Sequence, residues 1–390
     1  MKEAIFPAQW NQALASLPPS GIRNMLKLAS TMDNAIHLSI GQPDFPTPHF
    51  IIEASIRALN DGKTRYTVDS GLPELLEVLA KFYGDWYGRN LGPENLLVTC
   101  GASEALFLAI TAVAVPGSEV VVLEPSFINY QPLVEFAGAR AVPIVTTASG
   151  GYQPDVEEVI AAFGSATSAI ILNSPGNPTG VVIEPERMKA IVSEAVNRGI
   201  TVISDEVYDR ITLDGQDRPG VMIWTDDLDH IISISSVSKT YSMPGYRVGW
   251  LISSRENVEK LRRYHIYSST VNNTSAQWAA LAAFQGDQNC VAEMVGQYTR
   301  RRNRVVELLK HIPDFQSYRP DGAFYVMPSL PAGSNASAIA EQLLHDTGVC
   351  VVPGATFGQS CANAVRISFA NSMENIETAF ERMTDWFAQR

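Results

Sequence analysis

Between residues 95 and 252, short apolar runs alternate with segments of helical length, and this alternation constrains the fold more than any other feature of the chain. The runs lie at residues 96–98, 120–123, 169–172, 201–203, 231–232 and 248–251. Because the runs are mostly apolar at successive positions, they would present apolar side chains to both faces of a sheet. Such strands, most of them separated by helix-length segments, predict an α/β fold with a largely parallel sheet covered by helices. A ligand of such a sheet binds at the carboxyl ends of its strands, where the polar and glycine-rich segments of this chain occur.

The rest of the chain indicates a second, smaller α+β unit, since 390 residues are too many for one small core. Helices are predicted at about 48–60, 72–87, 288–310, 336–346 and 373–388, and short strands at 323–326 and 365–369. We expect an N-terminal arm with part of the small domain at 1–45, a large domain at 46–287 and a small domain at 288–390. The arginine-rich run at 300–304 is predicted to be a solvated helix face.

Charge and composition exclude several classes of protein. A net charge of −12 and a pI near 5.0 leave no basic stripe for nucleic acid. No apolar run approaches the roughly 18 residues of a membrane helix, and the N-terminus lacks a signal-like pattern, so we expect a cytoplasmic protein with no membrane partner. The cysteines are far apart and predicted to be buried thiols, with no disulfide framework and no metal site. They are Cys100, Cys290, Cys350 and Cys361.

Lys239 stands between two hydroxyl residues, directly after the apolar run that begins at residue 231. It is therefore expected to leave the end of a strand and enter a crevice, with Arg247 eight residues further on. Desolvation and a neighbouring cation would lower the pKa of this amine, and a neutral amine condenses with aldehydes. The alternative is an ordinary solvated lysine, which is what a serine-rich loop alone would favour.

Three other segments also follow strand-like runs. Residues 99–105 turn from a strand into a helix whose free amides suit a phosphate, although a plain helix start capped by Ser103 is the alternative. Residues 173–180 form a turn with two prolines and two glycines, rigid enough to aim the Asn177 amide into a pocket. Asp205 ends a buried run, where a carboxylate is costly unless a cation pairs with it.

Taken together and in this order, the segments resemble the class I/II, fold-type I pyridoxal-phosphate aminotransferases. The resemblance runs from about Leu38 to the C-terminus. It is carried by Asn173 to Gly180, Asp205-Glu206-Val207-Tyr208, Ser236-x-Ser238-Lys239 with Arg247, and Val365-Arg366-Ile367-Ser368-Phe369. It implies a large domain with a seven-stranded, mostly parallel sheet and a smaller α+β domain.

The resemblance also implies a role for individual residues. Lys239 would hold pyridoxal 5′-phosphate as an internal Schiff base and transfer the substrate's proton, and Asp205 would pair with the protonated pyridine nitrogen. Asn177 and Tyr208 would contact the ring's phenolic oxygen, and Phe127 would stack on the ring, although a role in the core is the alternative for Phe127. The phosphate would be held by Gly101, Ala102, Ser103, Ser236, Ser238 and Arg247. Arg366, with Gly41 and Asn177, would bind the substrate's α-carboxylate.

The implied activity moves an amino group between an L-amino acid and a 2-oxo acid by a ping-pong route. In the family a tyrosine matching Tyr66 reaches the phosphate of the neighbouring subunit, so a homodimer is expected. A C–S lyase or related synthase on the same fold is the alternative, and a non-catalytic regulatory protein that binds the cofactor is a third interpretation. A side-chain carboxylate would require a further cation, for which Arg23, Arg65, Arg262 and Arg263 are equal candidates.

Overall fold

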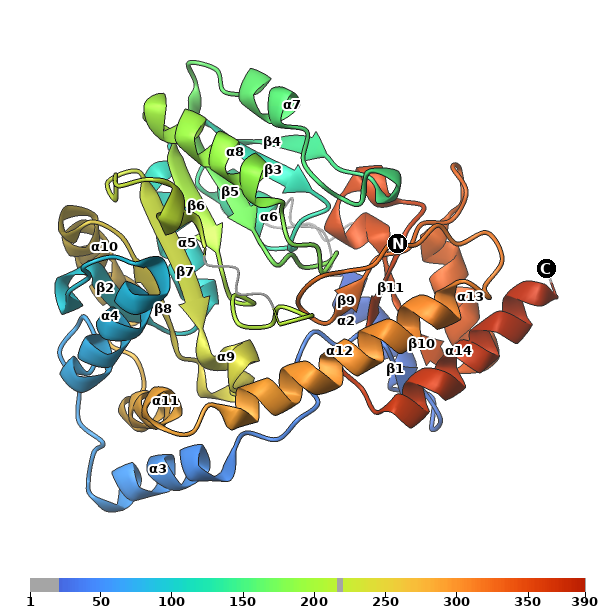
Figure 1. Cartoon of the computed structure of the whole chain (residues 1–390), viewed down its shortest axis with the longest axis horizontal. Coiled ribbons are helices and arrows are strands. Elements are labelled where there is room, and N and C mark those ends of the chain that lie inside the picture. Colours follow the sequence, from blue (N-terminus) through green and yellow to red (C-terminus); the bar gives the residue numbers. More distant parts are fainter. Residues whose placement is uncertain (1–20, 216–219, 390) are drawn as a thin grey trace, which may run out of the picture.

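The computed structural model describes residues 21–215 and 220–389, so the first 20 residues of the predicted arm lie outside the described residues. A seven-stranded sheet with the order β2-β8-β7-β6-β5-β3-β4 forms the centre of the larger part of the molecule (Figure 1). Its strands are β2 (Leu96–Thr99), β3 (Glu119–Glu124), β4 (Arg140–Val145), β5 (Thr167–Asn173), β6 (Thr201–Asp205), β7 (Ile231–Ser236) and β8 (Gly249–Ile252). Only the pairs that β8 makes, with β2 and β7, are antiparallel. The predicted α/β fold with a mostly parallel sheet is confirmed.

One strand of this sheet was not among the predicted apolar runs. The strand β4 contains Pro143, which has no N–H to donate, and proline is found in sheets mainly on edge strands. The strand lies at the edge and pairs with β3 alone. The six predicted runs all correspond to observed strands. Only β4 was missed, because an edge strand that contains proline lacks the uninterrupted apolar pattern of the other six.

Helices cover both faces of the sheet, because the strands bury side chains on both sides. Leu96 and Val98 belong to one apolar cluster and Leu97, between them, to another. The first cluster packs under α3 (His49–Asn60), α4 (Pro73–Tyr87), α7 (Val156–Ala161), α8 (Pro185–Asn197) and α11 (Thr274–Gln285). The second packs under α5 (Ala102–Val113), α6 (Tyr130–Phe136) and α10 (Arg255–Ser268). This burial on two faces is what the uninterrupted aliphatic runs predict.

A third apolar cluster lies in the smaller part of the molecule, among helices and short strands from both ends of the described chain. The helices are α2 (Gly21–Ala29), α12 (Asn289–Leu309), α13 (Ala336–Thr347) and α14 (Met373–Ala388). The strands are β1 (Ile36–His37), β9 (Tyr325–Val326), β10 (Val349–Cys350), β11 (Val352–Pro353) and β12 (Val365–Ser368). The long helix α12 runs from beside α9 (Val237–Thr240) and α11 towards α14 (Figure 1). The predicted helices of this region are therefore present, whereas the domain boundaries at residues 45/46 and 287/288 stay predictions.

The prediction of a solvated face for the arginine run at 300–304 is wrong for two of its members. Arg301 and Arg302 are buried, with exposed fractions of 7% and 0%. Arg301 donates two hydrogen bonds to the Asp44 carboxylate, at 2.7 and 2.8 Å. Arg302 donates to Asp214 at 2.6 Å and to the Pro320 carbonyl at 2.7 Å. The two guanidiniums are buried because acceptors from distant parts of the chain satisfy them.

The four cysteines are all free thiols. Cys350 and Cys361 are buried, as predicted, whereas Cys100 and Cys290 are half-buried.

Short 3₁₀ helices connect several elements: η1 (Pro93–Asn95), η2 (Ala148–Gly150), η3 (Val221–Trp224), η4 (Pro244–Tyr246), η5 (Gly354–Phe357) and η6 (Gln359–Cys361). Among residues 21–215 and 220–389, no helix is both long and apolar enough to cross a bilayer.

Candidate active site

Three neighbouring parallel strands bring polar residues to one edge of the sheet. Asn173 ends β5, Asp205 ends β6 and Ser236 ends β7. Asn173 and Asp205 are partners in the ladder, and the Asn173 side-chain amide donates to the Asp205 carbonyl at 2.8 Å. The segments that the sequence singled out therefore meet at the carboxyl ends of the strands, where parallel sheets bind ligands.

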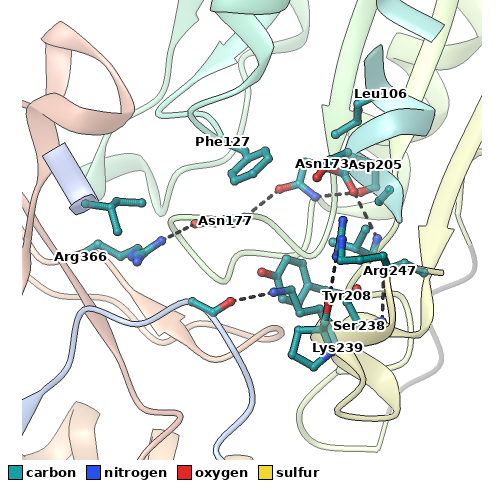
Figure 2. Close-up of a pocket in the computed structure, with 17 residues that line it drawn as sticks. Leu106, Phe127, Asn173, Asn177, Asp205, Tyr208, Ser238, Lys239, Arg247 and Arg366 are labelled. Carbon is teal, nitrogen blue, oxygen red and sulfur yellow. Dashed lines mark hydrogen bonds between the residues drawn. The ribbon is translucent and has the colours of Figure 1, made fainter. Parts of the chain in front are cut away.

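A pocket of about 280 Å³ lies at this edge, and all the candidate site residues line it except Gly101 and Tyr66 (Figure 2). The candidates that line it are Gly41, Ala102, Ser103, Phe127, Asn177, Asp205, Tyr208, Ser236, Ser238, Lys239, Arg247 and Arg366. Five residues that the sequence assigned no role complete the lining: Ile22, Leu106, Asn173, Val207 and Pro244. In Figure 2, Arg366 and Arg247 approach the pocket from opposite sides.

Lys239 lies in the short helix α9 (Val237–Thr240), which begins directly after β7. The Ser236 hydroxyl caps this helix by accepting the Ser238 N–H at 3.3 Å. The Lys239 amine donates to the Gly41 carbonyl at 2.7 Å. Burial first, then the charges of Arg366 and Arg247, lower the pKa of Lys239 from 10.5 to about 8. Part of the amine is therefore neutral, and able to act as a nucleophile or base, near neutral pH.

Asp205 is a buried carboxylate without an ion-pair partner within the described ranges of the chain. Burial raises its pKa from 3.8 to about 6, even though the hydrogen bonds from Tyr130 and the Val207 N–H lower it. Tyr130 donates to Asp205 Oδ2 at 2.6 Å and Val207 N to Oδ1 at 3.3 Å. A carboxylate in this state is stabilised by a cation that enters the pocket.

Arg366, on β12, is a buried guanidinium that likewise has no carboxylate partner among residues 21–215 and 220–389. Its Nη1 donates to Asn177 Oδ1 at 3.0 Å and its Nη2 to the Ser39 carbonyl at 2.6 Å. Its Nε has no hydrogen-bond partner in this described part of the chain. Burial lowers the pKa of Arg366. A buried cation with donors to spare indicates that the pocket receives an anion here.

Arg247 lies against the start of α5, at the opposite side of the pocket. The helix begins at Ala102 with Gly101 as its cap residue, so the alternative with Ser103 as the cap is wrong. Gly101 has a φ of +74°, and a Cβ there would collide with the guanidinium of Arg247. Arg247 itself has a left-handed φ of +55° and donates to the carbonyls of Pro244 and Cys100. Backbone strain at a non-glycine residue is typical of a functional site.

Comparison with known proteins identifies the family to which the chain that carries these side chains belongs. Residues 33–383 match the family described as aminotransferase class I and II. The chain belongs to this family. The chain is 38% identical to a probable aspartate aminotransferase of Methanocaldococcus jannaschii over 93% of this chain and 96% of that protein. It is 32% identical to aromatic-amino-acid aminotransferase 2 of Thermococcus litoralis, over 95% and 96% of the two chains.

A solved structure extends the similarity to the whole fold of this aminotransferase. The crystal structure of an aspartate aminotransferase from Thermotoga maritima matches with a TM-score of 0.92 and 34% identity. The match covers 97% of this chain and 100% of that one. The expected resemblance to class I/II aminotransferases, their fold and their enzymatic activity is thus confirmed.

Two tyrosines that contact residues lining the pocket had no role predicted from the sequence. Tyr130 is the hydrogen-bond donor to Asp205, and Tyr325 shares a hydrogen bond of 2.9 Å with Tyr208. The Tyr325 ring also lies 4.7 Å from the guanidinium carbon of Arg366. Tyr130 follows Phe127 by three positions. Neither position carries a local sequence signal, because each partner lies far away along the chain.

Tyr66 is not brought to the pocket of its own aminotransferase chain. Its side chain is 84% exposed, in the loop between α3 and α4. Its predicted contact with the site of a neighbouring subunit stays a prediction.

Proposed function

We propose that this aminotransferase uses pyridoxal 5′-phosphate to move an amino group between an L-amino acid and a 2-oxo acid by a ping-pong route. One observation supports it above the others. The pocket combines an amine, Lys239, with a carboxylate and two guanidiniums that have no ion-pair partner in the described residues, namely Asp205, Arg247 and Arg366. This set complements an aldehyde, a protonated ring nitrogen, a phosphate and a substrate carboxylate.

The residues present fit the cofactor. Asp205 would hold the ring nitrogen, and the cation would relieve the burial cost that raises the pKa of this carboxyl group. Arg247, with the first residues of α5 and the hydroxyls of Ser236 and Ser238, would hold the phosphate. Phe127 would pack against the ring, and Asn177 and Tyr208 would contact its phenolic oxygen. When bound, pyridoxal phosphate supplies an electron-withdrawing ring that stabilises negative charge developing at the substrate's α-carbon.

Arg366 and Lys239 would act on the substrate itself. Arg366 would bind the α-carboxylate through its guanidinium, beside Gly41 and Asn177, and so orient the α-carbon. Lys239, in its neutral form, would take the α-proton at Nζ and later return it. The lowered pKa of this amine suits the role, because the free base is then accessible at moderate pH.

We further propose a homodimer in which Tyr66 of one subunit reaches the pocket of the other. The loop that carries Tyr66 is attached to α10 by the ion pair between Asp69 and Arg262. Tyr66, Val68 and Tyr267 are all strongly exposed, with exposed fractions of 84%, 54% and 89%. Exposed apolar side chains in one region are typical of an interface between subunits. The molar mass in solution, measured by light scattering, tests this part.

The activity is tested by mixing the protein and pyridoxal phosphate with single L-amino acids in the absence of an acceptor. A transaminase releases the matching 2-oxo acid in an amount equal to the loaded enzyme and then stops until an acceptor oxo acid is added. Continued release of ammonia and pyruvate from a cysteine conjugate would instead establish the lyase. Lys239→Ala should abolish turnover and leave the fold intact, whereas Lys81→Ala, at an exposed site, should retain activity. Full activity of Lys239→Ala would contradict the proposal.

A further inference from the structure

Glu104 lies in the first turn of α5, next to the proposed phosphate site, and the proposed function gives it no role. Its side chain is only 9% exposed and does not line the pocket. Its Oε2 accepts the Cys100 N–H at 2.6 Å, whereas the Cys100 carbonyl accepts a hydrogen bond of 3.3 Å from Arg247 Nη2. The Cys100 backbone is therefore held at its N–H by Glu104 and at its carbonyl by the arginine proposed to bind the phosphate.

Glu104 is itself fixed by the end of α10. Its Oε1 accepts hydrogen bonds from the Ser269 hydroxyl, at 2.6 Å, and from the Ser268 hydroxyl. The third partner is the fully buried His265, whose Nδ1 lies 3.1 Å from the same oxygen. Burial raises the pKa of Glu104, but the hydrogen bonds from His265, the two serines and the Cys100 N–H outweigh it and lower the pKa to about 2. An ionised carboxylate only accepts hydrogen bonds, so His265 donates here and Glu104 is a charged acceptor in a fixed place.

The turn before α5 is held at two further points. Gly249 of β8 packs directly against it, since a Cβ there would lie 2.5 Å from both Ala102 N and the Gly101 carbonyl carbon. The Asn272 side chain donates to the Thr99 carbonyl at 2.8 Å. The first N–H groups of a helix have no acceptor inside the helix, and their direction follows from the turn that precedes them. A phosphate bound at the start of α5 therefore depends on how firmly this turn is held.

We infer that Glu104 is a positioning residue for the cofactor's phosphate, because it fixes the Cys100 backbone so that the first amides of α5 and the Arg247 guanidinium converge on that group. This inference rests on the proposed function, which places the phosphate at the start of α5. The negative charge of Glu104 would by itself repel a phosphate, so its favourable effect comes from the hydrogen bond to Cys100 and not from its charge. The side-chain amide of glutamine, which accepts the same hydrogen bond without a charge, should therefore replace it.

The test compares two ligands of the cofactor-free protein: pyridoxal 5′-phosphate, and pyridoxal, which lacks the phosphate. The ratio of their Kd values, from titrations followed by protein fluorescence, measures what the phosphate contributes to binding. In Glu104→Ala, we expect the Kd for pyridoxal 5′-phosphate to rise by about 10-fold or more and the Kd for pyridoxal to change by less than about 2-fold. Glu104→Gln should bind both ligands within about 3-fold of the wild type, because the acceptor remains.

Two further variants separate this role from a purely structural one. Thr111→Ala removes a different contact between α5 and α10, the hydrogen bond of 3.2 Å from the Thr111 hydroxyl to the Tyr264 hydroxyl, and should leave the ratio unchanged. Ser269→Ala is a milder change than Glu104→Ala, since it removes only one donor to the carboxylate. It should shift the ratio in the same direction by a smaller factor.

An equal loss of affinity for both ligands in Glu104→Ala would reduce Glu104 to a structural role and overturn the inference. Unchanged or tighter binding of pyridoxal 5′-phosphate would also overturn it, and so would equal losses in Glu104→Ala and Glu104→Gln, while the proposed function would stand. If Glu104→Ala does not fold, an unchanged ratio in Ser269→Ala has the same consequence. A wild type that binds the two ligands equally well would overturn the proposed phosphate site, and the inference with it.

Discussion

The hydroxyl of Tyr130 donates a hydrogen bond of 2.6 Å to Asp205 Oδ2, and both residues are buried. Tyr130 lies on α6 and Asp205 at the end of β6, 75 positions apart in the sequence. This bond opposes the effect of burial, because it stabilises the ionised carboxylate and lowers the pKa of Asp205. The tyrosine is thereby placed to keep Asp205 negative for the cation that we propose it binds.

Tyr130→Phe should therefore weaken the binding of pyridoxal phosphate. Loss of a hydrogen bond to a charged group costs about 1.5–3 kcal/mol, so the Kd should rise on the order of 10-fold or more. The pKa of Asp205 is about 6 with Tyr130 present and should be higher without it. As the pH is lowered, the affinity for pyridoxal phosphate should therefore begin to fall at a higher pH in the variant than in the wild type. The reason is that a protonated Asp205 carboxyl group cannot pair with a cation. Cofactor titrations between about pH 5 and 8 measure both effects.

The matched control for this prediction is Tyr152→Phe. Tyr152 is also buried, and its hydroxyl donates to the Met327 carbonyl at 2.9 Å, away from Asp205. Its removal should lower stability but leave the pH dependence of cofactor binding unchanged. Equal behaviour of the two variants would show that Tyr130 acts only through general stability.

Gly101→Ala should disrupt the proposed phosphate site. The substitution places a methyl group in the space of the Arg247 guanidinium, at a φ of +74° that non-glycine residues rarely adopt. Displacement of Arg247 removes a charge-assisted contact to the phosphate, so the Kd for pyridoxal phosphate should rise by roughly 10-fold or more. Gly245→Ala, two residues from Arg247 with open space around its Cβ position, should bind the cofactor normally. Normal affinity in Gly101→Ala would indicate that Arg247 does not hold the phosphate.

The lowered pKa of Lys239 makes a prediction about the stability of the cofactor-free protein. A lysine whose pKa falls from 10.5 to about 8 on folding is neutral in the folded state and charged in the unfolded state between these values. The unfolded state then binds more protons, so stability rises with pH across this window, and below pH 8 the folded protein carries the full cost of burying the charge. The shift corresponds to about 3 kcal/mol, partly offset by about 1 kcal/mol from the hydrogen bond to Gly41.

Lys239→Met should consequently be more stable than the wild type by about 2 kcal/mol near pH 7. This advantage should shrink as the pH rises from 8 towards 10.5. Denaturant unfolding of both cofactor-free proteins at several pH values measures the difference. Lys81→Met, at an exposed position of α4, should show no such pH-dependent gain. A constant difference for Lys239→Met across this pH range would contradict the lowered pKa.

Local patterns were sufficient to predict the fold and part of the pocket, whereas Gly41, Phe127, Tyr208 and Arg366 were expected only from the family resemblance. Aliphatic runs such as 169–172 are buried on both faces, and the polar residues that follow them gather at the carboxyl ends of the strands. Lys239 and Asp205 could be found in this way. The edge strand β4 was not found, since Pro143 interrupts the pattern of a central strand.

Contacts between distant side chains could not be predicted in the same way. Tyr130 and Tyr325 gain their roles only when packing brings them to Asp205 and Arg366. The arginine run shows the same limit. Arg301 meets Asp44 from 257 positions away, and nothing near residue 301 indicates that partner. A charge run on a helix is usually solvated, so the local rule gave the wrong answer where tertiary contacts supply buried acceptors.

The neighbouring arginine of the same run, Arg302, leads to a prediction about the stability of the protein alone. Arg302 is fully buried on α12, where it joins Asp214 to the Pro320 carbonyl. Arg302→Ala leaves the Pro320 carbonyl without its hydrogen-bond donor and opens a cavity. Asp214 keeps its ion pair with Arg319. We expect a loss of about 3 kcal/mol in the free energy of unfolding. Arg300→Ala removes the exposed arginine two positions earlier on the same helix and should cost less than about 0.5 kcal/mol. Denaturant unfolding of the two variants decides the matter, since equal small losses would mean that the burial of Arg302 contributes no net stability.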